Sequence, residues 1–144
     1  MKKTTRFKLF NFWPPFLGSG IKIKKISEDL RRVEVEMRQR FWNTNLNGSH
    51  YGGSIFSMTD PFYAVILQEH LGRGFTVWDK AATIRFKKPG MGTIRAVYEI
   101  APGRIEEIRT KLQIQDKLDE EFIAVIIDKD GDVVAEVQNK IGRA

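Results

Sequence analysis

The stretch from Tyr51 to Gly72 constrains the fold more than any other, because its apolar residues recur at the spacing of a helix. Written out, it is YGGSIFSMTDPFYAVILQEHLG. The apolar positions are Ile55, Phe56, Met58, Phe62, Tyr63, Val65, Ile66 and Leu67. A helix with this many apolar side chains is typical of a protein interior, so other elements must surround it.

Asp60 lies in the middle of this apolar stretch, where a carboxylate costs free energy unless it is paired or used. One interpretation makes Asp60 a working acid or base. The other makes it the N-cap of a helix that begins at Pro61, since Asp followed by Pro is a common helix start. The residues before Asp60 are also compatible with a helix, and a proline inside a helix requires a kink. These residues alone leave both interpretations open.

The rest of the chain alternates between apolar and polar residues, which is typical of half-exposed strands. We expect strands over 21–26, 30–41, 75–88 and 92–100, a short helix over 102–114, and two strands within 120–141 joined at Asp128–Asp132. The strands over 75–88 and 92–100 are predicted to form a hairpin around Pro89-Gly90. In the short helix, Glu107 and Lys111 have the spacing of an ion pair.

The order of these elements favours an α+β architecture. One curved antiparallel sheet of about six strands would wrap around the single long apolar helix. The length of 144 residues suits one domain with one core. Pro14-Pro15 and the glycines at 18 and 20 separate an N-terminal arm, residues 1–17, from the domain at 18–144.

Composition excludes several classes of chemistry. The chain has no cysteine, which rules out disulfides and cysteine nucleophiles, and its two histidines cannot build a usual zinc site. No apolar run approaches the roughly 20 residues of a membrane span. Arg6, Lys8 and Asn11 interrupt the apolar part of the first residues, so we expect no cleaved signal and a cytoplasmic protein.

Positive charge is concentrated near the N-terminus. Residues 1–40 contain 11 Lys and Arg and 4 Asp and Glu, a net of +7, while the remaining residues carry 13 and 14, a net of −1. A basic arm that also contains Phe7, Phe10, Phe12 and Trp13 can favour a membrane surface or a nucleic acid. Ordinary solubility is the simpler explanation.

The order of elements and the start of the apolar helix resemble the hotdog superfamily. Phenylacetyl-CoA-type thioesterases in it carry N-x-x-G-x-x-H-G-G followed by Asp after seven residues. Five of the six marked positions match here, as Asn45, Gly48, Gly52, Gly53 and Asp60, and the departure is Tyr51 in place of His. Residues 12–142 also resemble a hotdog group described as tetrameric acyl-CoA thioesterases, in the segments GSHYGGSIFSMTDPFYAVIL, LGRGFTVWDKAATIRFKKPG and DKDGDVVAEVQNK.

Thioester hydrolysis requires a donor for the developing oxyanion and a base or nucleophile. The backbone amides of Gly52 and Gly53, at the start of the helix, are the candidate donors, and Asp60 is the candidate base or nucleophile. Seven residues of helix separate Gly53 from Asp60 by about 10 Å, too far for one carbonyl to reach both. A shared site in a dimer solves this, and the resemblance likewise implies a dimer or a tetramer.

Five further residues are candidates for substrate contact: Asn45, His50, Tyr51, Ser57 and Trp78. Each also has a structural explanation, as a turn, a cap or a core residue. The diphosphate of CoA would use cations at the rim of the site, for which Arg73, Arg85, Lys87 and Lys88 are candidates. Asp79 and Lys80 should face opposite sides of their strand and form no ion pair with each other.

The resulting hypothesis is an acyl-CoA thioesterase that needs no cofactor beyond the CoA of its substrate, forms a homo-oligomer, and binds no nucleic acid. One alternative is a protein with the same fold that binds acyl-CoA or lipid without hydrolysing it. The presence of Tyr51 where those thioesterases carry His favours this alternative. Another is a peripheral binder of membranes or nucleic acid that acts through the basic arm. Hydration of an enoyl thioester, which other hotdog proteins perform, stays open as well.

Overall fold

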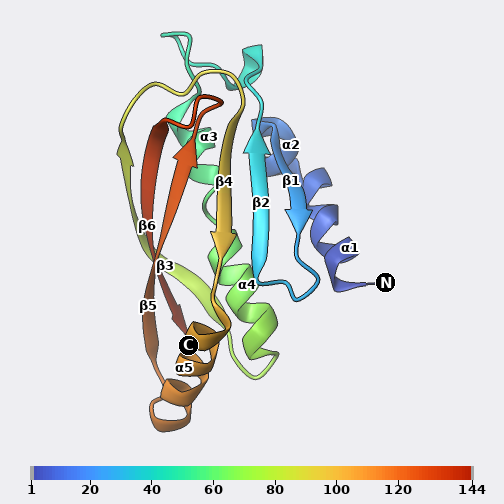
Figure 1. The fold of residues 1–144 in the computed structure, drawn as a ribbon, viewed down its shortest axis with the longest axis vertical. Helices are drawn as coiled ribbons and strands as arrows, with labels where there is room; N and C mark the ends of the chain where they lie inside the picture. Colours follow the sequence, from blue (N-terminus) through green and yellow to red (C-terminus); the bar gives the residue numbers. More distant parts are fainter. Residues whose placement is uncertain (1, 144) are drawn as a thin grey trace.

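Six strands form one antiparallel sheet in the order β1-β2-β4-β5-β6-β3 (Figure 1). The computed structural model describes residues 2–143. The strands are β1 (Ile21–Ile26), β2 (Arg32–Met37), β3 (Val77–Phe86), β4 (Ile94–Glu99), β5 (Leu118–Ile127) and β6 (Val133–Arg143). In β2, β4 and β5 alternate side chains are buried, as the sequence pattern predicts for strands with one face on the core. The predicted α+β architecture is confirmed.

The central helix lies against one face of this sheet and is interrupted in its middle (Figure 1). It consists of α3 (Gly52–Ser57) and α4 (Phe62–Leu71), separated by the turn Met58–Pro61. Proline has no N–H to continue the helical hydrogen bonds, and its ring clashes with the preceding turn, so the helix breaks there. The N-cap of α4 is Pro61, and Asp60 makes no side-chain capping bond to that helix.

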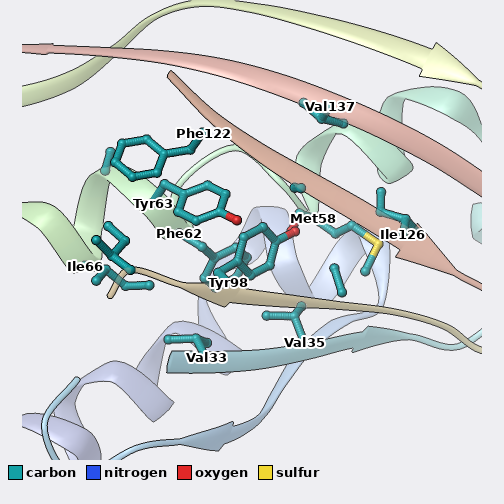
Figure 2. Packing of buried hydrophobic residues seen from close by; sticks show 14 of the residues in the cluster. Val33, Val35, Met58, Phe62, Tyr63, Ile66, Tyr98, Phe122, Ile126 and Val137 are labelled. Carbon is teal, nitrogen blue, oxygen red and sulfur yellow. The ribbon is translucent and has the colours of Figure 1, made fainter. Parts of the chain in front are cut away.

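Buried aromatic rings join the helix to the sheet and anchor its break (Figure 2). The rings of Phe62 and Tyr98 stack with centroids 4.8 Å apart, and those of Tyr63 and Phe122 stack at the same separation. The hydroxyl of Tyr98 donates to the carbonyl of Met58 at 2.6 Å, which satisfies a carbonyl that the broken helix leaves free. The sheet thereby holds in place the turn that carries Asp60.

The predicted hairpin between β3 and β4 is wrong. β3 pairs with β6, whereas β4 pairs with β2 and β5, so the connection through Pro89-Gly90 crosses over the sheet instead of folding back (Figure 1). Alternation identifies a strand but carries no information about its neighbour, and the glycines near residue 90 suit a crossing loop as well as a tight turn. As a result β3 is an edge strand, at the opposite end of the sheet from β1.

The N-terminal arm packs on the domain as the helices α1 (Lys3–Lys8), η1 (Leu9–Phe12) and α2 (Pro14–Ser19), beside β1 (Figure 1). Phe7 and Phe16 are buried, and the ring of Phe16 lies 5.7 Å from that of Phe62. The expected boundary at residues 17 and 18 therefore falls inside α2.

Two further helices complete the fold, η2 (Phe41–Asn43) and α5 (Pro102–Ile114). The predicted ion pair on α5 is present, with Glu107 and Lys111 3.6 Å apart.

Among residues 2–143, no helix combines the length and the apolar character that crossing a membrane requires.

Candidate active site

The start of α3 presents backbone N–H groups that the rest of the described chain does not use. Ser54 and Ile55 donate back to the carbonyl of Tyr51, but within residues 2–143 the amides of Gly52 and Gly53 have no acceptor. Such free donors at a helix start form a site for negative charge. Both amides are free to donate to a ligand, and the role of the two glycines as oxyanion donors remains a prediction.

Both glycines are covered by aromatic rings. A Cβ built on Gly53 would lie 2.5 Å from Cε2 of Tyr51, and one built on Gly52 would lie 3.1 Å from Cζ of Phe86. A side chain at residue 53 would therefore collide with Tyr51. Phe86 belongs to β3, so the start of α3 is packed against one end of the edge strand.

Asn45 shapes the loop before α3. Its Oδ1 accepts from the backbone N–H of Asn47 at 2.9 Å and of Ser49 at 3.1 Å, and its Nδ2 donates to Ser49 Oγ at 3.0 Å. These bonds fit the turn-forming explanation of this asparagine. Contact with a substrate remains a prediction.

His50 is buried, at 2% exposure. Its Nε2 lies 2.5 Å from the carbonyl oxygen of Gly92, and because a carbonyl only accepts, Nε2 carries the proton. Burial lowers the pKa of His50, which keeps the ring neutral. The structure thus places His50 between the α3 loop and the crossing loop, away from open solvent.

Ser57 and Trp78 occupy different surroundings. The hydroxyl of Ser57 donates to the carbonyl of Gly53 at 2.8 Å, so its proton is engaged within α3. Trp78 lies on β3 with 46% of its surface exposed. Tyr51, at 59%, is exposed as well. The two exposed rings could meet a ligand directly, whereas Ser57 would act through its lone pairs.

Asp60 is exposed at the break between α3 and α4. Even so, partial burial by the surrounding protein raises the pKa of Asp60 above its ordinary value of 3.8. No hydrogen bond or ion pair within residues 2–143 involves its carboxyl group. A carboxylate free of protein partners is available to a water or a substrate.

Asp79 is a second acidic group of this region, which the sequence singled out only as forming no ion pair with Lys80. Burial, and after it the negative charge of Asp60, raises the pKa of Asp79 to about 6. Its Oδ1 is buried and has no hydrogen-bond partner in the described chain. The pairing of β3 with β6 shifts register between Asp79 and Ala81, and such a bulge re-aims side chains. Lys80 pairs with Asp119 at 2.7 Å, in agreement with the expectation that Asp79 and Lys80 form no ion pair.

A groove of about 420 Å³ opens beside the start of α3. Its walls include Gly52, Phe86, Lys87 and Lys88. Lys88 already pairs with Asp128 at 2.9 Å and with Asp132 at 3.1 Å, and Lys87 lies 3.9 Å from Glu136. Arg73 and Arg85 have no ion pair among residues 2–143.

Three carboxylates, of Asp128, Asp130 and Asp132, lie within 4.8 Å of one another in the β5–β6 turn. Lys88 compensates two of them, and Asp128 Oδ1 accepts the backbone N–H groups of Asp130 and Asp132. These ion pairs and hydrogen bonds account for the closeness of the three carboxylates as part of the turn.

The candidate residues fall into two groups along β3. One group is the pair of free amides beside Phe86 at one end of the strand. The other is the carboxyl pair of Asp60 and Asp79 at the other end. The spacing of Gly53 and Asp60 along the chain predicts that one thioester carbonyl would not reach both within a single chain.

Comparison with known proteins identifies the family. Residues 3–142 match a family described as a domain of unknown function, DUF4442. Among proteins with curated descriptions, none matches the chain significantly.

Solved structures share the fold. A Pseudomonas aeruginosa protein of unknown function, described as a probable thioesterase, superposes with a TM-score of 0.87 at 22% identity, over 97% of this chain and 94% of that one. The PaaI protein from the phenylacetic acid degradation operon of E. coli gives 0.70 at 21% identity, over 98% and 91%. A Haemophilus influenzae thioesterase gives 0.73 at 14% identity, over 97% and 89%. These similarities show that the chain has the hotdog fold, and the family match over residues 3–142 shows that it belongs to the DUF4442 family.

Proposed function

We propose that this protein hydrolyses the thioester of an acyl-CoA at a site shared by two subunits. The observation that carries the proposal is the placement of free amides and a free carboxyl group at opposite ends of one edge strand. Gly52 and Gly53 lie at the Phe86 end of β3, and Asp60 lies close to Asp79 near its other end. The thioesterases among the solved structures of this fold support the reaction class.

The edge strand supplies a way to assemble the dimer. β3 has ten residues, pairs with no strand but β6 among residues 2–143, and exposes Ala81, Ala82 and most of its other side chains. A long open edge is a template for pairing with another strand. If two copies of β3 pair antiparallel about a two-fold axis, the Asp79 end of one strand lies beside the Phe86 end of the other. Asp60 of one subunit then approaches Gly53 of its partner, twice per dimer.

The chemistry follows from the groups brought together. The amides of Gly52 and Gly53 stabilise the negative oxygen that develops when the thioester carbonyl is attacked. Asp60, as a base, removes a proton from water, and the resulting hydroxide bonds to the carbonyl carbon. When the carbon–sulfur bond breaks, the proton on Asp60 passes to the leaving thiolate, which yields a carboxylic acid and CoA. Direct attack by Asp60, followed by hydrolysis of the anhydride, uses the same residues.

Asp79 assists as a positioning group in this proposal. With a pKa raised to about 6, Asp79 keeps its proton to a higher pH than an ordinary aspartate does, and two interacting carboxyl groups can share one proton and one charge. A protonated Asp79 can donate a hydrogen bond to the attacking water or to Asp60. Trp78, exposed on the same strand, would border the acyl slot.

The CoA portion would lie over the groove beside α3. Lys87 and Lys88 line this groove and are the nearest cations for its phosphates, although both have carboxylate partners within the described chain; Arg73 and Arg85 have no such partner there but do not line the groove. CoA enters this scheme only as part of the substrate. The exposed apolar side chains Val97, Ile123 and Val125 on the outer face of the sheet offer a contact between two dimers, which would make a tetramer.

Subunit complementation tests the shared site. Asp60→Asn removes the base. Gly53→Val introduces a side chain that collides with Tyr51 next to the oxyanion donors. Each homodimer should therefore release almost no thiol from acyl-CoA. A refolded one-to-one mixture contains about half heterodimers with one intact site each, and should recover about a quarter of wild-type activity. A mixture as inactive as its components, with heterodimers present by native mass spectrometry, would exclude the shared site.

Binding of acyl-CoA without turnover is the second candidate function. It is favoured by Tyr51, which stands where the thioesterases of the resemblance carry His and whose ring covers Gly53. Saturable binding of a non-hydrolysable acyl-CoA thioether, together with no thiol release from any acyl-CoA, would establish this alternative.

A further inference from the structure

A second surface, away from β3, combines exposed aromatic and aliphatic side chains with arginine and lysine. We name it the aromatic-basic surface; it consists of Leu17, Lys22, Arg38, Arg40, Phe41 and Trp42. Phe41 is 87% exposed, Leu17 56% and Trp42 53%, and Lys22, Arg38 and Arg40 are also exposed. Leu17 lies on α2, Lys22 on β1, and the other four in the segment that follows β2 and includes η2. Figure 1 shows α2 beside the end of β2 at which this segment begins.

One buried side chain fixes these elements together. Asn43, which is 2% exposed, donates from Nδ2 to the carbonyls of Ser19 and Arg38, each at 2.9 Å, and accepts the backbone N–H of Arg40 at 2.7 Å. It thereby joins the end of α2, the end of β2 and the start of η2. The outward position of Phe41 and Trp42, whose rings contact edge to face at 5.2 Å, is therefore built into the fold.

The cations of this surface lie around a groove of about 210 Å³. Its one acidic residue, Glu36, is paired with Lys24 at 3.5 Å. Lys22, Arg38 and Arg40 have no ion pair within residues 2–143, and the guanidinium of Arg40 lies 5.8 Å from the ring of Trp42. This groove is therefore free to hold an anion next to an aromatic ring.

We infer that the aromatic-basic surface docks the protein on membranes that contain anionic lipids. Tryptophan and phenylalanine beside arginine and lysine match an interface in which phosphate head groups lie next to acyl chains. The net charge of +7 in residues 1–40, which supply four of the six residues, adds long-range attraction. Leu17 and Phe41 project outward without lining the groove, which suits insertion between lipids better than stacking on nucleic-acid bases.

This inference stands independently of the proposed thioesterase activity. β1 and β3 are at opposite edges of the sheet, so dimerisation through β3 would leave the aromatic-basic surface uncovered. Removing the whole arm would not be a sound test, because Phe7 and Phe16 are part of the packed interior. Point variants of exposed side chains are required.

Vesicle sedimentation tests the charge requirement. The full chain should bind vesicles of phosphatidylcholine and phosphatidylserine, bind phosphatidylcholine alone weakly, and detach as salt rises. Arg38→Gln with Arg40→Gln should weaken binding about thirtyfold, whereas the matched control, Lys117→Gln with Lys129→Gln in exposed positions elsewhere, should weaken it far less. Equal loss in both double variants, or no binding by the wild type, would overturn the inference.

Insertion is tested with Trp42 as a reporter. Trp13→Phe with Trp78→Phe leaves Trp42 as the one remaining tryptophan of three. Its fluorescence should be quenched by brominated acyl chains in anionic vesicles, and Phe41→Ala should reduce both quenching and binding. Absence of quenching while single-stranded RNA binds with the same arginine dependence would assign the surface to nucleic acid instead. A change of oligomeric state in the arginine variants would assign it to a second copy.

Discussion

The negative charge of Asp60, at the break in the central helix, acts on Asp79, on the edge strand, and together with burial it raises the pKa of Asp79 to about 6. The larger contribution comes from burial. Two carboxyl groups that interact in this way titrate as a pair, and one of them keeps its proton at a pH where an ordinary aspartate has lost it. This relationship leads to two predictions.

The first prediction concerns activity and pH. If protonated Asp79 positions the water, kcat of the wild type should change near the pKa of about 6, where Asp79 loses its proton. Asp79→Asn keeps a neutral side chain at every pH. Its activity should be within a few-fold of the wild type at about pH 5, and its profile should lack the inflection near 6. Parallel kcat profiles of both proteins from acid to alkaline pH would contradict a positioning role.

The second prediction concerns stability and pH. A carboxyl group whose pKa is raised on folding stabilises the native state fully below its ordinary value of 3.8, and this contribution is lost as pH rises through about 6. The wild type should therefore lose stability between these values, and Asp79→Asn should lose less. Urea unfolding at several pH values measures this. Asp116→Asn, at an exposed position, serves as the control, and equal pH dependence in Asp79→Asn and the wild type would contradict the burial of Asp79.

The strands and the apolar character of the central helix were predictable, because both depend on local periodicity. The break at Pro61 was predictable as a kink, although its anchor, Tyr98 bonded to the carbonyl of Met58, joins residues too distant for a local pattern to reveal. The pairing of β3 was mispredicted because the alternation of apolar and polar residues does not indicate which strand pairs with which. The raised pKa of Asp79 could not be predicted for a similar reason. Its burial and its closeness to Asp60 depend on a bulge and a tertiary contact.

A third prediction tests the packing of Tyr51 on Gly53. Gly53→Ala should lower kcat/KM about tenfold, because the new Cβ would lie 2.5 Å from Cε2 of the tyrosine and must displace it or the backbone amide. Tyr51→Ala removes the collision, so the double variant should be more active than Gly53→Ala alone. Additive losses in this cycle would show that the two residues affect activity separately.

A fourth prediction tests assembly through the edge strand. Ala82→Glu places a carboxylate near the middle of β3, and a two-fold axis would bring two such charges together. Analytical ultracentrifugation should show dissociation to monomers, with activity lost in proportion. Gln113→Glu adds the same charge at an exposed position of α5 and should change neither property. An unchanged dimer in Ala82→Glu would require another interface.

The central claim is that Asp60 performs chemistry, and thiol release from a panel of acyl-CoAs by the wild type and Asp60→Asn tests it most directly. The two proteins are compared at matched folding and oligomeric state. The account predicts that the wild type turns over at least one acyl-CoA and that the variant is slower by about a hundredfold to ten-thousandfold, as expected for loss of a base. Equal activity of the two proteins would contradict the role of Asp60, and absence of thiol release from the wild type would contradict the thioesterase itself.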